Sequence, residues 1–280
     1  MILVADSGST KTDWRLINFT ETLAEVHTEG INPFHQRPEE IDRILRNSDL
    51  NQLISQTQEV YFYGAGCNYE DKIAMVRDAI RKLFPDANIF IEHDLLAAAR
   101  SLCGRDPGIA CILGTGSNSC FYDGKNIKAN NPSLGYILGD EGSGVYMGKK
   151  LIQDYLYKKL PKSISDHFDA QFSLTIDEIL DNVYSKYLPN RYLASFAEFV
   201  HDHVQHPYIH GIVYESFYDF MDNHISPYAS HAEYQTHFVG SIAYNFQDIL
   251  KRVTADAGLQ IGKVIKSPIE GLTLYHQNKI

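Results

Sequence analysis

The segment Asp6–Asp13, which reads DSGSTKTD, decides how the first part of the chain is expected to fold. It follows the short apolar run Ile2–Ala5, and the chain then resumes as Thr12–Asn18 with apolar residues on one face. Small turn-forming residues between two such segments predict a β-hairpin. Because any hairpin turn can be built from small polar residues, this pattern alone leaves an ordinary turn and a ligand-binding turn open.

The residue types in this turn are also those that bind phosphate. Backbone N–H groups around Gly8, the hydroxyls of Ser9 and Thr10, and the ammonium group of Lys11 can surround phosphate oxygens. The Asp6 carboxylate at the strand end can hold the water shell of a Mg²⁺ ion. The segment is not a Walker P-loop, because the pattern G-x-x-x-x-G-K-[ST] is absent. It is therefore a candidate phosphate site of another kind.

A second glycine-rich turn, GTGSN (Gly114–Asn118), follows another buried strand in the middle of the chain. Both regions show a strand, a turn rich in glycine and hydroxyls, a returning strand and a third strand before a helix, which is a repeat of topology and not of sequence. In two related halves, such turns would face each other across a cleft. The pair predicts a bipartite phosphate site, with Gly114 and Thr115 in its second part.

Strands alternate with helices between and after these hairpins. This order predicts an α/β fold with parallel strand pairs. Turn residues at Gly104–Gly108 mark the expected division into parts 1–106 and 107–280, the second with a helical insertion. The pattern predicts, among others, a strand at Ile89–Ile91 and helices at Asp94–Leu102, Val145–Leu160 and Ile242–Val253.

Two acidic positions stand where loops meet predicted helices. Asp94 follows a strand, and the carboxyl ends of strands carry functional residues in α/β sheets. A carboxylate there can take the proton of a hydroxyl that attacks phosphorus, or it can simply cap the helix. The composition of the glycine-rich loop Gly135–Gly144 favours a ligand-lining role, with a simple helix cap at Asp140 or Ser143 as the alternative.

Composition limits the classes of partner. The chain has 280 residues, 44% of them hydrophobic, which is typical of a globular protein. Its formal net charge of -10 makes nucleic acid and anionic membranes poor candidate partners. The N-terminus has no signal-peptide pattern, and no apolar run is long enough to span a bilayer. The four cysteines form no C-x-x-C pair. We therefore expect a cytoplasmic protein with buried thiols. An anionic ligand would have to be attracted by local groups, because the overall charge of the chain repels it.

In combination these segments resemble a known superfamily. Asp6–Asp13, Gly114–Asn118 and Val239–Ser241 are similar to the first phosphate, second phosphate and adenosine segments of the sugar kinase/Hsp70/actin superfamily. The pair GTGSN and GDEGS (Gly139–Ser143) resembles the N-acetylglucosamine kinase branch of the BadF/BadG/BcrA/BcrD ATPase family. The resemblance implies two ribonuclease H-like (actin-like ATPase) lobes around a central nucleotide cleft. It also implies ATP and Mg²⁺ as cofactors and an amino sugar, most simply N-acetylglucosamine, as the substrate.

The resemblance also implies roles for individual residues. Asp94 would be the catalytic base, and Gly240 and Ser241 would lie under the adenosine. The sugar would be bound by four residues from separate loops: Asn32, Gly116, Asn118 and Asp140. The stretch Leu160–His231 matches no motif, and we expect it to contribute to the second lobe and to a homodimer surface.

Two alternatives remain open at this level. A BcrA-like ATPase that activates a radical dehydratase would need cysteine thiolates for an iron–sulfur cluster, whereas Cys111 and Cys120 fall on the two strands of one predicted hairpin. A sugar or ATP sensor, or an actin-like assembling protein, would bind the ligands without catalysis. The histidines at 201, 203, 206 and 210 suggest a metal site, but His201 and His203 would diverge on a helix, which favours a hydrated surface.

Overall fold

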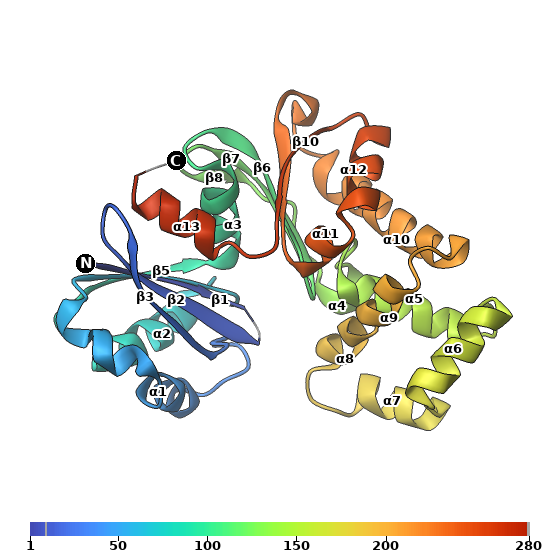
Figure 1. The fold of residues 1–280 in the computed structure, drawn as a ribbon, viewed down its shortest axis with the longest axis horizontal. Coiled ribbons are helices and arrows are strands. Elements are labelled where there is room, and N and C mark those ends of the chain that lie inside the picture. The colour runs from blue at the N-terminus through green and yellow to red at the C-terminus, as the bar shows by residue number, and fades with distance from the viewer. Residues whose placement is uncertain (9, 279–280) are drawn as a thin grey trace. The chain divides into compact units, whose positions relative to one another are not determined.

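The computed structural model describes residues 1–8 and 10–278, and the chain forms two compact units (Figure 1). Unit 1 consists of Met1–Asp106, Asp123–Ile127 and the C-terminal segment from Ser267, and unit 2 of Pro107–Tyr122 and Lys128–Lys266. These units differ from the predicted division at 106/107 in two places, a short hairpin tip and the C-terminal segment, which both group with unit 1. The division of the chain into parts 1–106 and 107–280 stays a prediction.

Unit 1 is built on a five-stranded mixed sheet with the strand order β3-β2-β1-β4-β5. β1 pairs antiparallel with β2 and parallel with β4, and β4 pairs parallel with β5. In the hairpin register Asp6 lies directly opposite Asp13, so the two carboxylates of the DSGSTKTD segment share one end of the sheet. The strands are β1 (Ile2–Ser7), β2 (Lys11–Ile17), β3 (Thr22–Glu29), β4 (Glu59–Gly64) and β5 (Asn88–His93).

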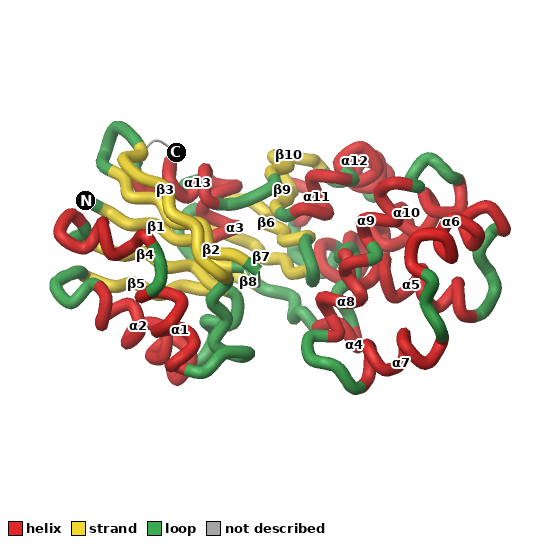
Figure 2. The backbone as a smooth tube through the Cα atoms, turned by 60° about the horizontal axis from the view of Figure 1, so that its bottom comes forward, coloured by secondary structure: helices red, strands yellow, loops and turns green. Residues whose placement is uncertain are grey.

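Helices cover both faces of this sheet. α1 and α2 lie on one face, and α3 and α13 lie on the other (Figure 2). The first face buries a core that includes Trp14 and Phe62, whose ring centroids are 5.7 Å apart. Asp94 is the first residue of α3, directly after β5. The helices are α1 (Pro38–Arg46), the 3₁₀ segment Asp49–Gln56, α2 (Glu70–Leu83), α3 (Asp94–Cys103) and α13 (Ile269–His276).

The C-terminal helix α13 packs directly on α3. Gly271 lies so close to α3 that a Cβ atom there would be 2.4 Å from the Ser101 carbonyl oxygen. The His276 ring lies 2.9 Å from the Tyr63 hydroxyl, which also accepts a 2.6 Å hydrogen bond from Arg100. These contacts join residues far apart in the sequence, so no local pattern indicated that the last segment belongs to unit 1.

Unit 2 repeats the topology with the strand order β10-β9-β6-β7-β8. β6 takes the place of β1, and it pairs in parallel with β9 just as β1 pairs with β4. The predicted α/β class and the repeat of topology are therefore confirmed. The strands are β6 (Pro107–Leu113), β7 (Ser117–Asp123), β8 (Ile127–Ala129), β9 (Gln235–Val239) and β10 (Gln260–Ile265).

A set of helices between β8 and β9 forms the helical part of unit 2 (Figure 1). No helix in the described part of the chain is long and apolar enough to cross a membrane. The helices are α4 (Gly135–Leu138), α5 (Gly144–Leu156), α6 (Lys162–Phe172), α7 (Ile176–Tyr184), α8 (Pro189–Ser195), α9 (Ala197–Asp202), α10 (Pro207–Phe220) and the π-helix Met221–Ile225; two more, α11 (Ser241–Asn245) and α12 (Gln247–Asp256), follow β9.

Aromatic side chains fill the interior of this helical part. Phe168 packs with Phe196 and Phe199 at centroid distances of 5.8 and 5.3 Å, so α6 contacts the α8–α9 region through rings. Tyrosine hydroxyls at its edge donate to aspartates; one such bond, from Tyr208 to Asp154, is 2.7 Å long. The abundance of aromatic residues in this stretch is thus explained by packing between helices.

Candidate active site

The β1–β2 hairpin of unit 1 is held by its hydroxyls. The Ser7 and Thr12 side-chain oxygens are 2.7 Å apart, and Ser7 Oγ also accepts a 2.9 Å hydrogen bond from the Ile31 amide. The Gly8 amide donates to the Lys11 carbonyl at 3.0 Å, and the Thr10 carbonyl accepts from Gly30 at 2.9 Å. Ser9, a predicted phosphate-binding residue, lies outside the described residues. The hairpin is therefore joined to the Gly30–Asn32 segment by specific hydrogen bonds.

Three carboxylates of unit 1 influence one another. Burial chiefly, and then the nearby Asp13 and Asp94 charges, raise the pKa of Asp6 to about 7 against the opposing charge of Lys11. Asp13 is better compensated, because His27 Nδ1 lies 2.7 Å and Lys11 Nζ 2.9 Å from its oxygens. Burial is therefore the main cause of the raised pKa of Asp6, and the neighbouring carboxylates add to it.

Asp94 follows directly after β5, where the strand ends and α3 begins. The helix cap is His93, whose side chain accepts from the Leu96 amide at 3.2 Å, while Asp94 is the first helical residue. Burial raises the pKa of Asp94, and the His93 charge and backbone N–H groups at the helix start oppose that rise. A carboxylate with a raised pKa is suited to accept a proton near neutral pH.

The raised pKa of Asp6 has a consequence for stability. In the unfolded chain this carboxyl ionises near pH 3.8, whereas in the folded protein it does so near pH 7. Its contribution to stability is therefore complete below pH 4 and is lost as the pH rises through 7.

Asp6→Asn removes this loss, since asparagine does not ionise. We expect the variant in EDTA to be about 1–2 kcal/mol more stable than the wild type at pH 8, a Tm rise of a few degrees, and the difference to shrink toward pH 4. Thermal melts of both proteins across this range measure it. A variant that melts below the wild type at pH 8 would show that Asp6 is not destabilised by burial.

Asn32 lies in a tight loop beside the hairpin. Its Oδ1 atom accepts a 3.0 Å hydrogen bond from the Phe34 amide. Gly66, at φ +83°, packs against it so closely that a Cβ atom would lie 2.6 Å from that oxygen. Next to Gly66, burial and then the nearby charge of Asp94 raise the pKa of the Cys67 thiol to about 12. Asn32, Asp94 and the hairpin therefore belong to one region of unit 1.

In unit 2 the GTG turn is fixed to the start of α5. The amides of Gly144 and Val145 donate to the Gly114 and Thr115 carbonyls at 2.9 and 3.1 Å. Ser143 caps α5, since its Oγ accepts from the Tyr146 amide at 3.2 Å. Of the two candidate caps in the acidic loop, the structure assigns this role to Ser143.

Asp140 instead points toward the GTG turn. It adopts φ +59°, and its Oδ1 accepts a 3.2 Å hydrogen bond from the Ser117 amide. A Cβ atom at Gly116 would be 3.0 Å from the same oxygen, so a side chain there would crowd the Asp140 carboxylate. Burial raises the pKa of Asp140. Asn118, one residue beyond Ser117, accepts from the Asn130 side chain at 2.9 Å.

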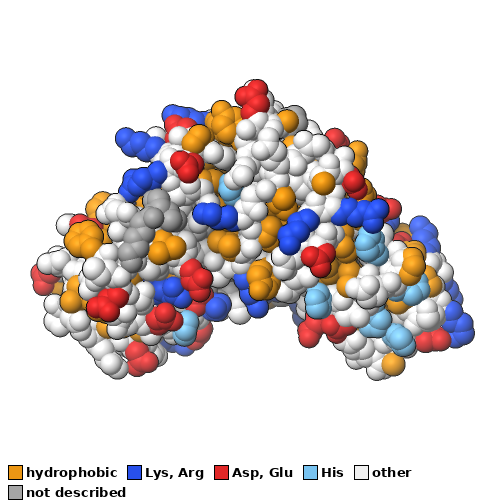
Figure 3. Space-filling view, turned by 45° about the horizontal axis from the view of Figure 1, so that its top comes forward, with side chains coloured by type: hydrophobic (Ala, Val, Ile, Leu, Met, Phe, Trp, Pro, Cys, Tyr) orange, Lys and Arg blue, Asp and Glu red, His pale blue; other side chains and the backbone are white. Residues whose placement is uncertain are grey.

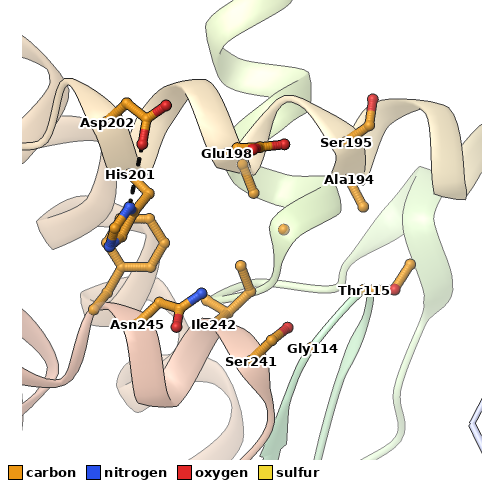
Figure 4. A pocket seen from close by; sticks show the side chains of 13 residues that line it. Gly114, Thr115, Ala194, Ser195, Glu198, His201, Asp202, Ser241, Ile242 and Asn245 are labelled. Carbon is orange, nitrogen blue, oxygen red and sulfur yellow. Dashed lines mark hydrogen bonds and ion pairs between the residues drawn. The ribbon is translucent and has the colours of Figure 1, made fainter. Parts of the chain in front are cut away.

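Unit 2 also contains a cavity of about 470 Å³, lined by the GTG turn and by helices α8, α9 and α11 (Figure 4). Gly114, Thr115 and Ser241 line one end of it. Gly240, at φ +127°, lies beside this end, and a Cβ atom there would be 2.2 Å from the Leu113 carbonyl oxygen. The structure thus brings together the second phosphate residues and the predicted adenosine residues within one unit.

The remaining walls of this cavity were not predicted from the sequence. Glu198, His201 and Asp202 come from the α9 helix, and Asn245 and Phe246 follow Ser241 at the end of α11. His201 Nδ1 lies 3.5 Å from Asp202 Oδ1, and the His201 ring meets Phe246 edge-on at 5.5 Å. On each helix, the spacing of the lining residues places them on one face. The sequence of either helix alone does not indicate that the two helices lie against the same cavity.

Sequence reasoning also missed a buried contact between a glutamate and a histidine beside the acidic loop. Glu141 Oε2 lies 3.2 Å from Nε2 of His224, which is on the π-helix, and both side chains are largely buried. The His224 carbonyl accepts from the side chains of Ser119 and Asn131 at 3.2 and 2.7 Å. The π-helix therefore fixes both the acidic loop and the strand that carries Asn118.

Histidine side chains gather on the surface of the helical part of unit 2 (Figure 3). His167 Nδ1 and His203 Nε2 are 3.1 Å apart, and the ring of His203 stacks on Phe199. Within residues 1–8 and 10–278, no group of three or more His, Cys, Asp or Glu side chains is placed to hold a metal ion. These histidines pack and line surfaces in the described structure.

Comparison with known proteins places the chain in a family. A solved structure from Porphyromonas gingivalis, described as a candidate N-acetylglucosamine kinase, is 44% identical to the chain, covers 99% of both chains and superimposes with a TM-score of 0.95. The chain belongs to the N-acetylglucosamine kinase-like branch of the BadF/BadG/BcrA/BcrD ATPase family. No family model matches its sequence.

More distant relatives agree with this assignment. The N-acetylmuramic acid/N-acetylglucosamine kinase of Clostridium acetobutylicum is 25% identical over 211 residues, which are 71% of this chain and 69% of that protein. A structure from Chromobacterium violaceum, also described as a candidate N-acetylglucosamine kinase, is 16% identical with a TM-score of 0.67 over 98% of both chains, which shows the shared fold.

Proposed function

We propose that this chain is an ATP-dependent kinase that transfers a phosphoryl group to a hydroxyl of an amino sugar, with N-acetylglucosamine as the first candidate. The observation that carries the proposal is the 44% identity over 99% of the chain with a candidate N-acetylglucosamine kinase. All four cysteines are buried, which disfavours the alternative of an ATPase that needs thiolates for an iron–sulfur cluster.

We assign the nucleotide to two groups of residues. The Gly114–Thr115 turn and the hairpin with Gly8, Thr10 and Lys11 would bind the phosphates, mostly through backbone N–H groups. Gly240 and Ser241 would lie under the nucleoside, and the absence of a side chain at Gly240 lets this segment pack directly against the Leu113–Gly114 backbone. Ser9 belongs to the same assignment on its sequence position alone.

The residues of unit 1 fit a Mg²⁺ ion that is held mainly by water and by the nucleotide. Mg²⁺ typically uses one or two carboxylates, several waters and substrate phosphates, so a full set of protein ligands is not required. Asp6, whose pKa is raised to about 7 by burial and by the neighbouring carboxylates, would hold it through water. When bound, the ion neutralises charge on the phosphates.

For catalysis we assign Asp94 as the general base. Its carboxylate would take the proton of the attacking sugar hydroxyl, and Lys11 would stabilise charge on the transferred group. The sugar would be held by Asn32, Asn118 and Asp140, and by the backbone of Gly116. Catalysis of this kind depends chiefly on orientation, and the structure fixes Asp140 through Ser117 and Asn32 through Phe34.

Asn118→Ala tests the sugar assignment. We expect a rise of about 3- to 10-fold in the KM for the sugar, with the KM for ATP almost unchanged, because one neutral hydrogen bond to substrate is lost. Steady-state kinetics with each substrate varied in turn measure this. Asn182→Ala, a partly exposed residue of α7 whose side chain donates to the Glu178 carbonyl of its own helix, is the control and should match the wild type. An unchanged sugar KM in Asn118→Ala would remove Asn118 from the site.

A sugar screen tests the proposed activity itself. ATP consumption by the purified protein with Mg²⁺ is followed over N-acetylglucosamine, N-acetylmannosamine, N-acetylmuramic acid, glucosamine and glucose, with no sugar as the blank. We expect consumption above the blank with N-acetylated amino sugars and a phosphorylated product by mass spectrometry. Equal consumption in every arm and in the blank would contradict the kinase assignment.

We also infer a homodimer and a cytoplasmic location. Apolar side chains of α4 and α7 are exposed, among them Ile137 and Leu138 at 70% and 74%, which supports an interface with a second copy. Four buried thiols are consistent with a reducing compartment. Light scattering on a size-exclusion column decides the dimer, since a mass near 31.7 kDa would indicate a monomer.

A further inference from the structure

The cavity of unit 2 is acidic, although the ligand assigned to it is an anion. Its lining residues include the carboxylates Glu198 and Asp202 and no lysine or arginine. A triphosphate would be repelled by this wall, so the phosphates must lie at the other end, against Gly114 and Thr115. The nucleoside is then the part of the nucleotide that faces the carboxylates.

Two helices carry matching series of polar side chains along the cavity. Ser195, Glu198 and Asp202 lie three and four residues apart, and so form one face of the nearly continuous α8–α9 segment. Ser241 and Asn245 lie four residues apart and likewise share one face of α11. In Figure 4, Thr115 and Ser241 lie at one end, His201 and Asp202 at the other, and Glu198 lies between the two ends.

Glu198 and Asp202 differ in their partners. Asp202 has His201 Nδ1 at 3.5 Å, whereas the Glu198 carboxylate makes no hydrogen bond or ion pair with any residue of 1–8 and 10–278. An ionised carboxylate can only accept hydrogen bonds, so a ligand that satisfies Glu198 must present donors. In a nucleotide the donors at middle distance from the phosphates are the two ribose hydroxyls.

We propose that Glu198 accepts hydrogen bonds from the ribose hydroxyls and makes this protein discriminate against 2′-deoxynucleotides. The inference rests on the proposed function, because it takes the cavity to be a nucleotide site. The far end, with Asn245 and the His201 ring held against Phe246, then faces the base. A hydroxyl bound to a carboxylate is a charge-assisted hydrogen bond, which is stronger than a neutral one.

The test compares ATP with 2′-deoxy-ATP in the wild type and in Glu198→Ala. We expect the wild type to bind ATP about 10–100 times more tightly than 2′-deoxy-ATP by calorimetry without sugar, as for one hydrogen bond to a charged group. In Glu198→Ala we expect this ratio to fall to nearly 1, chiefly through weaker ATP binding. Because Glu198 is exposed, its truncation should leave the melting temperature unchanged.

Glu215→Ala is the matched control, since this exposed glutamate of α10 does not line the cavity. It should keep the wild-type ratio. A wild type that binds ATP and 2′-deoxy-ATP equally, or a Glu198→Ala variant that keeps the wild-type ratio, overturns the role of Glu198 while the nucleotide site stands. Failure of the wild type to bind either nucleotide overturns the proposed function, and this inference with it.

Discussion

Asp94→Asn is expected to lower kcat by about 100-fold or more while the affinity for ATP changes little, as for loss of a general base. Asparagine has the same shape as aspartate but cannot take a proton from the sugar hydroxyl. The start of α3 should be preserved, because His93 and not Asp94 caps the helix. Sugar-dependent ATP consumption gives kcat, and calorimetry gives the Kd for ATP.

The pH dependence of this variant separates a base from a structural residue. Since burial raises the pKa of Asp94, kcat of the wild type should increase with pH as this carboxyl loses its proton. The residual activity of Asp94→Asn should lack that increase. Glu92→Gln, two residues earlier on β5, is the control and should keep both kcat and its pH profile. Full activity of Asp94→Asn at saturating substrate would exclude Asp94 as the base.

The parts of the fold that the sequence predicts well are those set by neighbouring residues. The β1–β2 and β6–β7 hairpins follow from apolar segments on either side of small turn residues, and the structure confirms both. The position of Asp94 at the junction of a strand and a helix is equally local. The repeated strand order then confirms that the two hairpins occupy equivalent places in their sheets.

Helix ends were harder to predict, because apolar periodicity can continue across a break. The residues Ile242, Phe246, Ile249 and Val253 suggest one helix, yet the chain forms α11 and α12 with Phe246 between them. Phe246 adopts φ -108° and lines the cavity beside His201. The break between the two helices therefore lies in the cavity wall, where Phe246 contacts His201 of α9. Such a contact is not encoded in the apolar spacing of α11 and α12.

The acidic cavity wall and the Glu141–His224 pair could not be predicted for a related reason. Glu141 and His224 are 83 residues apart. The His224 carbonyl also accepts hydrogen bonds from Ser119 on β7 and from Asn131 in the loop after β8, which are comparably distant in the sequence. In the sequence, nothing distinguishes Glu198 from other exposed glutamates on helices. Its place in the cavity wall depends on the position of α11. Contacts between residues so far apart in the sequence depend on tertiary packing, which the pattern of residues along one helix does not predict.

Gly240→Ala is expected to destabilise unit 2 strongly. The new Cβ atom would lie 2.2 Å from the Leu113 carbonyl oxygen and 3.2 Å from the Gly114 amide nitrogen, at a backbone φ of +127° that alanine rarely adopts. The combined strain and overpacking should cost about 3–5 kcal/mol, a fall in Tm of about 10 °C. Thermal melts of the variant and the wild type measure it.

The clash also reaches the proposed nucleotide site, which makes the loss more than a stability effect. Backbone that moves to accommodate the Cβ atom displaces Gly114, whose carbonyl accepts from Gly144 at the start of α5. We therefore expect weaker ATP binding even at temperatures where the variant is folded. Gly211→Ala is the matched control: a Cβ atom at this position of α10 meets nothing within 4 Å, so the variant should gain about 0.5–1 kcal/mol. Equal melting temperatures for Gly240→Ala and the wild type would show that β9 and the GTG turn are not packed as tightly as described.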